Sequence, residues 1–239
     1  DRHRVVLDAN SLQLELHGGA RSWRLEPSFA GDLEVRAGAK SGRIGLATAT
    51  NRVVTPYSTG YARGVKVELS GYRLEDTDLD LQLQLLLTLD GKDEEFVCEI
   101  VATDGMTRIQ ELLWPGSVEA GFYDATVVPF MQGMLLPRDW PEKAWLYDTL
   151  SYGRGLYMPW FGFQKAGAGG GLLVVLETAA DGGCQFTHPP GGPTVLRSRW
   201  VASLGRWSYP RRARFCLLDG DYVAMAKRYR RDAIEKGRF

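Results

Sequence analysis

The chain has 239 residues, of which 44% are hydrophobic and 24% charged, a composition that excludes a largely disordered protein. Its 29 basic side chains balance 29 acidic ones, so no net charge attracts nucleic acid or an anionic membrane. The longest apolar runs, such as residues 85–87, are far shorter than the roughly 20 residues that span a bilayer. We therefore expect a folded protein whose partner is neither nucleic acid nor membrane. No basic and apolar leader precedes Asp1, so the localisation stays open.

The first two thirds of the chain alternate apolar and polar residues, which is the period of a β-strand. The clearest alternations cover residues 12–16, 65–69 and 79–85. Asp90-Gly91 separates the last of these from an apolar run at 95–101, which predicts a hairpin. Further strands are predicted at residues 4–8, 43–47, 108–113, 172–176, 196–201 and 212–217. So many strands predict an all-β fold, a two-sheet antiparallel sandwich.

Two segments interrupt this alternation. Residues 114–160 contain four tryptophans and five prolines, which is typical of long ordered loops. Residues 182–193 combine paired glycines with three prolines and are predicted to form a surface loop. The glycines of residues 167–171 lack the lysine of a phosphate-binding loop and are interpreted as a hairpin turn.

The end of the chain changes from a strand period to a helix period. Apolar side chains recur at Met225, Ala226, Tyr229 and Ala233, so a helix is predicted over residues 221–236. Asp219 or Asp221 is expected to cap its first amides, and Gly237 to end it. The remaining positions are basic and are interpreted as a solvated face: Lys227, Arg228, Arg230 and Arg231.

Few residues suggest chemistry. The acids of residues 93–95, and Asp76, Asp78 and Asp80, are interpreted as solvated turn acids rather than a glycosidase pair. The histidines His3, His17 and His188 occur singly, so neither a metal site nor a cofactor is predicted. The cysteines Cys98, Cys184 and Cys216 are expected to be buried thiols.

The segment rich in aromatic residues and proline is the candidate binding site. Sugars pack their C–H faces on Trp and Tyr rings and bind polar groups through their hydroxyls. The predicted carbohydrate-binding residues are Gln132, Trp140, Tyr157 and Trp160. For Trp160 an alternative is core packing, because Met158 and Phe161 are its neighbours.

Five motifs occur in a familiar order: IQELLWPG (109–116), VPFMQGMLLP (128–137), LYMPWFG (156–162), SLG followed by YPR (203–211), and DYVAMAKRYR (221–230). Together they resemble the β-supersandwich, of galactose mutarotase-like fold, that precedes the catalytic (β/α)₈ barrel of endo-α-N-acetylgalactosaminidase-like glycoside hydrolases and related bacterial proteins. The resemblance covers roughly residues 109–239.

The resemblance implies a sandwich domain at residues 1–219 and a helix at 220–239 that leads toward a barrel. It also implies that the catalytic carboxylates lie beyond Phe239, so no catalytic residue is expected here and the isolated chain is expected to be inactive. The partners would be carbohydrate and the C-terminal catalytic barrel. Two alternatives remain: an autonomous carbohydrate-binding module, and an aldose 1-epimerase that uses His17 or His188.

Overall fold

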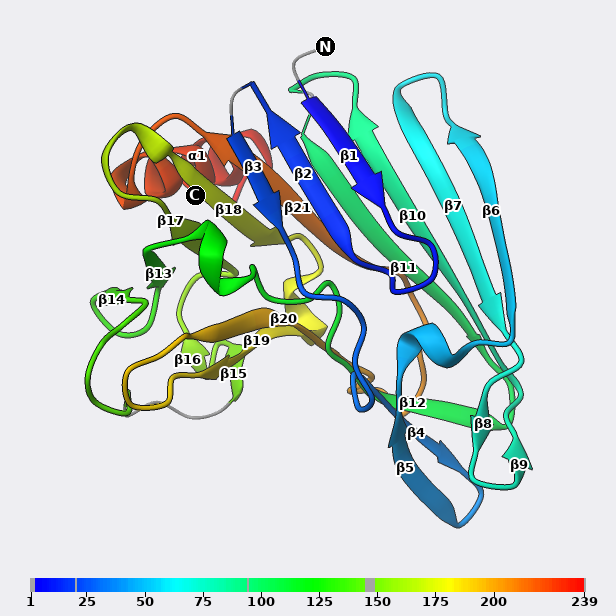
Figure 1. The fold of residues 1–239 in the computed structure, drawn as a ribbon. Coiled ribbons are helices and arrows are strands. Elements are labelled where there is room, and N and C mark those ends of the chain that lie inside the picture. The colour runs from blue at the N-terminus through cyan, green and yellow to red at the C-terminus, as the bar shows by residue number, and fades with distance from the viewer. Residues whose placement is uncertain (1–2, 20, 94, 145–148, 239) are drawn as a thin grey trace.

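The chain folds into two large β-sheets packed face to face (Figure 1). The structure, a computed structural model, describes all residues except 1–2, 20, 94, 145–148 and 239. The first large sheet has nine antiparallel strands in the order β14 (Met134–Pro137), β13 (Ala125–Val128), β17 (Trp160–Gln164), β18 (Gly171–Leu176), β21 (Arg211–Leu218), β11 (Phe96–Asp104), β10 (Leu81–Asp90), β7 (Ala62–Ser70) and β6 (Asn51–Ser58). The all-β prediction is confirmed.

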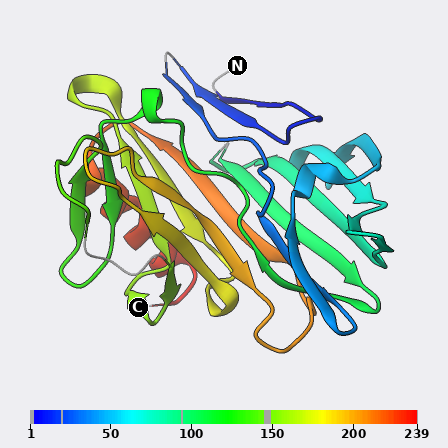
Figure 2. The same cartoon turned by 60° about the horizontal axis from the view of Figure 1, so that its bottom comes forward.

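The second large sheet has seven strands, which are antiparallel except for the pair β15–β16. Their order is β16 (Gly155–Leu156), β15 (Thr149–Tyr152), β19 (Gly182–Thr187), β20 (Val195–Val201), β12 (Thr107–Leu112), β4 (Leu33–Ala37) and β5 (Lys40–Ile44). Three further strands form a small sheet that adds to this second layer: β1 (His3–Leu7), β2 (Leu14–Gly18) and β3 (Arg21–Arg24) (Figure 2). A short hairpin, β8 (Arg73–Leu74) and β9 (Thr77–Asp78), completes the strands that the structure describes.

The predicted hairpin at Asp90-Gly91 lies inside the nine-stranded sheet, between β21 and β7. Strands β10 and β11 pair antiparallel, with Leu85 opposite Ile100. Leu81, Leu83 and Leu85 are buried, whereas Gln82, between the first two, is exposed. The alternation in the sequence therefore directs one face of β10 into the core between the sheets.

Two loop predictions and one strand prediction were wrong in part. Residues 114–160 contain four short strands, β13 to β16, because the Ala-Thr-Val-Val run before Pro129 has the β-branched composition of a strand. The segment 182–193 begins with a strand, β19, rather than a loop. A Cβ on Gly183 would lie 2.2 Å from the carbonyl oxygen of Leu150, so this glycine permits close strand contact instead of a turn. The strand expected at 43–47 ends at Ile44, and a 3₁₀ turn follows it.

The C-terminal helix forms as predicted and packs on the nine-stranded sheet. Helix α1 covers Tyr222–Glu235, and Asp221 caps it by accepting a hydrogen bond from the amide of Val223 at 2.9 Å. Met225 is fully buried against Val127, Trp160 and neighbouring side chains of β13, β17, β18 and β21. Helix α1 thus covers the outer face of one end of the nine-stranded sheet, while the larger core lies between the sheets.

Candidate functional site

Two of the four predicted binding residues lie on adjacent segments. Gln132 occupies the exposed turn of the hairpin β13–β14, where the amide of Gly133 donates to the carbonyl of Phe130. Tyr157 is 59% exposed, and its amide donates to the carbonyl of Pro129 at 3.0 Å. The structure therefore brings the Gln132 turn beside Tyr157, although these residues are 25 positions apart in the sequence.

Trp140 lies elsewhere, near the opposite end of the same hairpin. Its ring is 43% exposed, and its carbonyl accepts hydrogen bonds from the amide of Gly191 and the ring of His188. Trp140 is thus tied to the loop after β19 rather than to the Gln132 turn. The four residues do not form one group.

Trp160 is buried and packs beneath helix α1. Only 4% of Trp160 is exposed, and its ring lies 6.1 Å from the ring of Tyr229 between centroids. A ring in this position offers no face to a sugar, which favours the packing alternative for Trp160. The sugar-binding roles of Gln132, Trp140 and Tyr157 stay predictions.

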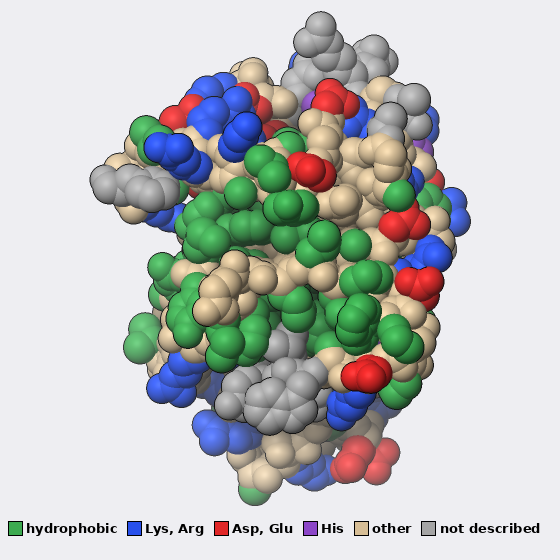
Figure 3. Space-filling view, turned by 90° about the vertical axis from the view of Figure 1, so that its left-hand side faces the viewer, with side chains coloured by type: hydrophobic (Ala, Val, Ile, Leu, Met, Phe, Trp, Pro, Cys, Tyr) green, Lys and Arg blue, Asp and Glu red, His purple; other side chains and the backbone are tan. Residues whose placement is uncertain are grey.

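An exposed apolar surface surrounds Gln132 and Tyr157. Figure 3 shows hydrophobic side chains gathered over the middle of the side of the molecule that carries β13, β14 and α1. Five large side chains at this end of the molecule are each at least 40% exposed: Met131, Leu135, Tyr152, Tyr157 and Met158. We call these five residues the apolar face. This exposed apolar surface is the candidate interaction site of the chain.

The helix is held to the sheet by buried charges rather than by a solvated basic face. Arg228 is buried and donates to both carboxylate oxygens of Glu95, at 2.7 and 2.6 Å. Arg214 of β21 also contacts Glu95, at 3.2 Å, and pairs with Asp90. The interpretations of Arg228 and Glu95 as solvated were therefore wrong; Glu94 lies outside the described residues.

The same cluster extends to the end of the helix. Lys236 and Arg214 contact one carboxylate oxygen of Glu177, at 2.7 and 2.9 Å. Burial opposes ionisation of Glu177, but the two cations outweigh it and lower the pKa of this carboxyl to about 2. We call this set the ion-paired seam: Asp90, Glu95, Glu177, Arg214, Arg228 and Lys236. Each of these charges has a partner within the chain, so the seam holds the helix in place and leaves no charge free for a ligand.

His188 and the three cysteines are buried in the fold. His188 is buried, and its Nε2–H donates to the carbonyl of Trp140 at 3.0 Å while Nδ1 lies 2.9 Å from the hydroxyl of Thr194. Both ring nitrogens are therefore engaged, and His188 is not placed as a free acid or base. All three cysteines are buried thiols, as predicted. In the part of the chain that the structure describes, no group of His, Cys, Asp and Glu is arranged to hold a metal ion.

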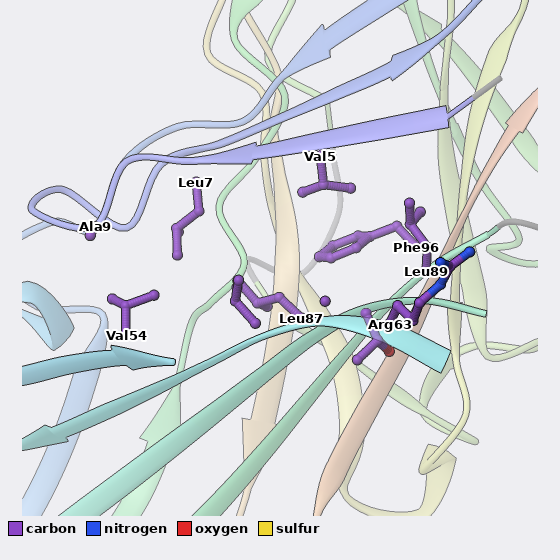
Figure 4. Close-up of a pocket in the computed structure, with 11 residues that line it drawn as sticks. Val5, Leu7, Ala9, Val54, Arg63, Leu87, Leu89 and Phe96 are labelled. Carbon is purple, nitrogen blue, oxygen red and sulfur yellow. The ribbon is translucent and has the colours of Figure 1, made fainter. Parts of the chain in front are cut away.

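An apolar pocket of about 250 Å³ lies between β1 and the nine-stranded sheet (Figure 4). Val5 and Leu7 of β1 point toward Leu87 of β10, Phe96 lies at one side, and Arg63 brings a charged group to the lining. A sugar needs several convergent donors and acceptors, and this lining is dominated by aliphatic carbon. The pocket is therefore a poor site for carbohydrate.

Another cavity, of about 530 Å³ and with a lining of both polar and apolar side chains, opens beside the outer face of the seven-stranded sheet. Its lining includes Glu26, Phe29, Gln185, Thr187 and Arg197. None of these was singled out in the sequence. Gln185 and Thr187 occur two apart, as side chains on one face of a strand do, but Glu26 and Phe29 come from a distant segment that only the fold places beside them.

Strand content, antiparallel sheet order and one packed terminal helix define the chain as an all-β sandwich domain. No protein-family model and no curated protein matches it. Among solved structures it is similar to the α-N-acetylgalactosaminidase NagBb from Bifidobacterium bifidum. The complex with N-acetylgalactosamine matches 99% of this chain with a TM-score of 0.84 and 26% identity. The ligand-free enzyme matches 100% of it with a TM-score of 0.83 and 25% identity.

The chain spans 38% of the length of NagBb in each of these comparisons. The resemblance to a domain of a glycoside hydrolase, predicted from the motifs, is therefore confirmed. No helix among the described residues is long and apolar enough to cross a membrane.

Proposed function

We propose that the chain is a non-catalytic β-sandwich domain of a glycoside hydrolase and that its apolar face packs against the catalytic part of the same polypeptide. The observation that carries this proposal is the full-length match to 38% of an α-N-acetylgalactosaminidase. A domain that matches only a part of an enzyme needs a surface to contact the rest. The apolar face has the character of such a surface, because exposed Met, Leu and Tyr side chains gain free energy when another surface removes them from water.

The position of the apolar face relative to α1 supports this arrangement. Leu135 pairs with Val127, whose side chain is buried on the α1 side of the nine-stranded sheet. The apolar face and the helix therefore lie on the same side of that sheet. The partner in this proposal is the C-terminal barrel of the parent polypeptide, and the sandwich is of the galactose mutarotase type that the motifs resemble.

Two residues of this region are placed to assist substrate binding. Gln132 is exposed at the tip of the β13–β14 turn, and its amide forms no hydrogen bond among the described residues. Tyr157 exposes its ring beside that turn. A catalytic cleft next to the apolar face would bring both groups to the edge of a carbohydrate substrate, where an amide and a ring bind hydroxyls and C–H faces. Cleavage of α-linked N-acetylgalactosamine is the activity we propose for the parent enzyme.

The test compares substitutions on the apolar face with substitutions at equally exposed apolar residues elsewhere. Leu135→Asp and Met131→Asp would be made in the parent polypeptide and in the isolated chain. Met106→Asp and Leu204→Asp are the controls, because these side chains are 83% and 75% exposed on distant turns. We expect the first two variants to lower the melting temperature and the hydrolysis of an aryl α-N-acetylgalactosaminide by the parent protein only. Equal behaviour of all four variants would remove the apolar face from the proposal.

The role of the turn is tested separately. Gln132→Ala and Tyr157→Ala should raise KM for an oligosaccharide substrate of the parent enzyme without lowering its melting temperature. Unchanged KM and kcat in both folded variants would exclude a contact with substrate and leave the packing role intact.

A further inference from the structure

The cavity of mixed lining beside β19 and β20 is the candidate for a further ligand site. The segment after β3 contributes Glu26 and Phe29, and the strands contribute Gln185, Thr187 and Arg197. This segment runs from the small sheet to β4 along the seven-stranded sheet (Figure 2). The site thus lies on the outer face of the seven-stranded sheet, beside the segment that connects the small sheet to β4.

Arg197 is the central group of this cavity. It is 9% exposed, and its Nη2 donates to Glu26 at 2.9 Å. Its guanidinium carbon lies 4.5 Å from the centre of the Phe29 ring, so the cation stacks on that ring. Its Nε is buried and has no hydrogen-bond partner among the described residues. A buried donor without a partner costs free energy.

Charged side chains next to the cavity on the same sheet form ion pairs with one another, whereas two polar side chains of the cavity form no hydrogen bond within the described part of the chain. Across β5, β12 and β20, Glu111 accepts from Arg43 at 2.6 Å and from Arg199 at 2.5 Å. By contrast, the side chains of Gln185 and Thr187 form no hydrogen bond with any residue that the structure describes. Two polar side chains that border the cavity are therefore available to a ligand.

The aromatic wall is held rigidly. The carboxylate of Asp32, which is fully buried, accepts hydrogen bonds from the amides of Phe29 and Leu46 at 3.1 and 2.6 Å. These bonds fix the loop that carries Phe29, whose ring is 39% exposed. A ring held in place before binding loses little conformational entropy when a ligand stacks on it.

From this geometry we propose that the cavity of Glu26, Phe29, Gln185, Thr187 and Arg197 binds a neutral saccharide unit. Adjacent sugar hydroxyls can form hydrogen bonds with the carboxylate of Glu26, the amide of Gln185 and the hydroxyl of Thr187. A C–H face of the sugar can pack on the Phe29 ring. The ligand is neutral because Glu26 already neutralises Arg197. This site goes beyond the proposed packing role and does not depend on the apolar face.

The test follows the side chains of the site directly by NMR. The ¹⁵N-labelled chain would be titrated with methyl α-N-acetylgalactosaminide while the Arg197 Nε–H and Gln185 amide resonances are recorded. We expect saturable shifts of both, and an increase in Kd of about tenfold in Gln185→Ala and in Thr187→Val, corresponding to the loss of about 1.4 kcal/mol. Gln82→Ala, which removes an exposed amide from β10 of the other large sheet, is the matched control and should leave Kd unchanged.

The outcomes separate this site from the proposed function. Absence of shifts at Arg197 and Gln185, or an unchanged Kd in both site variants, would overturn the saccharide site. Sensitivity of the same titration to Gln132→Ala alone would move binding to the β13–β14 turn and also overturn it. Titration with glucuronate tests the ligand class, since shifts with this acid in place of the neutral sugar would contradict neutral recognition. None of these results changes the expected effect of Leu135→Asp on the parent enzyme.

Discussion

The ion-paired seam and the apolar face lie on the same side of the nine-stranded sheet. They differ in whether their side chains have partners within the chain. In the seam, Arg228 and Glu95 are both buried and bonded to each other twice. On the apolar face, Met131 and Tyr157 expose 62% and 59% of their surface. Buried charges are retained only with partners, whereas exposed apolar side chains gain free energy only when a partner covers them.

This difference distinguishes the stability of the isolated chain from its proposed contact with the rest of a larger enzyme. The seam is complete within the 239 residues, so substitutions there should change the stability of the isolated chain. If the apolar face packs against the catalytic part as proposed, substitutions there should be nearly silent in the isolated chain and take effect in the parent polypeptide.

The largest effect is expected from breaking the seam at Glu95. Glu95→Ala leaves the buried Arg228 without its main partner, while Arg214 keeps Asp90 and Glu177, and the loss should cost about 3–5 kcal/mol of unfolding free energy. Asp93→Ala is the control, because Asp93 is more exposed and lies 3.4–3.8 Å from its arginines; an exposed pair contributes at most about 1 kcal/mol. Urea unfolding of the isolated chain measures both. Similar midpoints for the two variants would contradict a structural role for the seam.

Two tryptophans predicted to bind sugar provide the next comparison. Trp160→Ala should lower the unfolding free energy by about 3 kcal/mol or more, because it leaves a cavity beneath α1. Trp140→Ala should have a small effect, since its ring is 43% exposed. Thermal unfolding of both variants measures the difference. A Trp160→Ala variant that melts like the wild type would show that its ring does not stabilise the helix against the sheet.

The pH dependence of stability tests the seam at Glu177. The pKa of Glu177 is about 2 in the folded chain, below its ordinary 4.5, so its contribution is fully present above pH 4.5 and is lost as pH falls through 2. At about 1.4 kcal/mol for each pKa unit, this contribution is roughly 3 kcal/mol. Glu177→Gln should therefore flatten the fall in stability between pH 5 and pH 2.

The matched control for this titration is Glu142→Gln, which removes an exposed carboxyl with no ion pair among the described residues. It should keep the wild-type pH profile. The same acid sensitivity in both variants would show that Glu177 does not supply the acid-labile stability.

The smallest effect is expected on the apolar face itself. Leu135→Asp should change the unfolding free energy of the isolated chain by about 0.5 kcal/mol or less, as surface substitutions do. Leu136→Asp, one residue further, places a charge where the side chain is 6% exposed and should prevent stable folding. Circular dichroism melting of the pair measures this contrast, and a large loss in Leu135→Asp would mean that the apolar face already stabilises the isolated fold.

Local patterns in the sequence predict the elements whose side chains alternate between core and water. The Leu81–Asp90 strand and the helix were predicted because their periods are regular, and Asp221 has the position of a cap. Strand β19 was missed because paired glycines resemble a turn, while here they permit contact with Leu150 and Trp200. Burial of Arg228 had a signal, because it lies three residues after Met225 on the same helical face.

The candidate sites depend on contacts between distant segments and were predicted less completely. The exposure of Gln132 and Tyr157 fits the aromatic and proline-rich composition of their segments. Their proximity, however, depends on the bridge between Phe130 and Leu156. Arg197 and Glu26 are 171 residues apart. No spacing or motif in one sequence predicts such a pair, because sheet order places the two segments together.

Oxidative footprinting of the apolar face tests the central proposal most directly. Hydroxyl radicals modify exposed Met and Tyr side chains, so the rates at Met131, Tyr157 and Met158 report whether a partner covers them. We predict rapid modification of all three in the isolated chain and strong protection in the parent polypeptide, with the exposed Met106 unchanged in both. Equal rates at the three residues in the two proteins would contradict the packing of this face against the catalytic part.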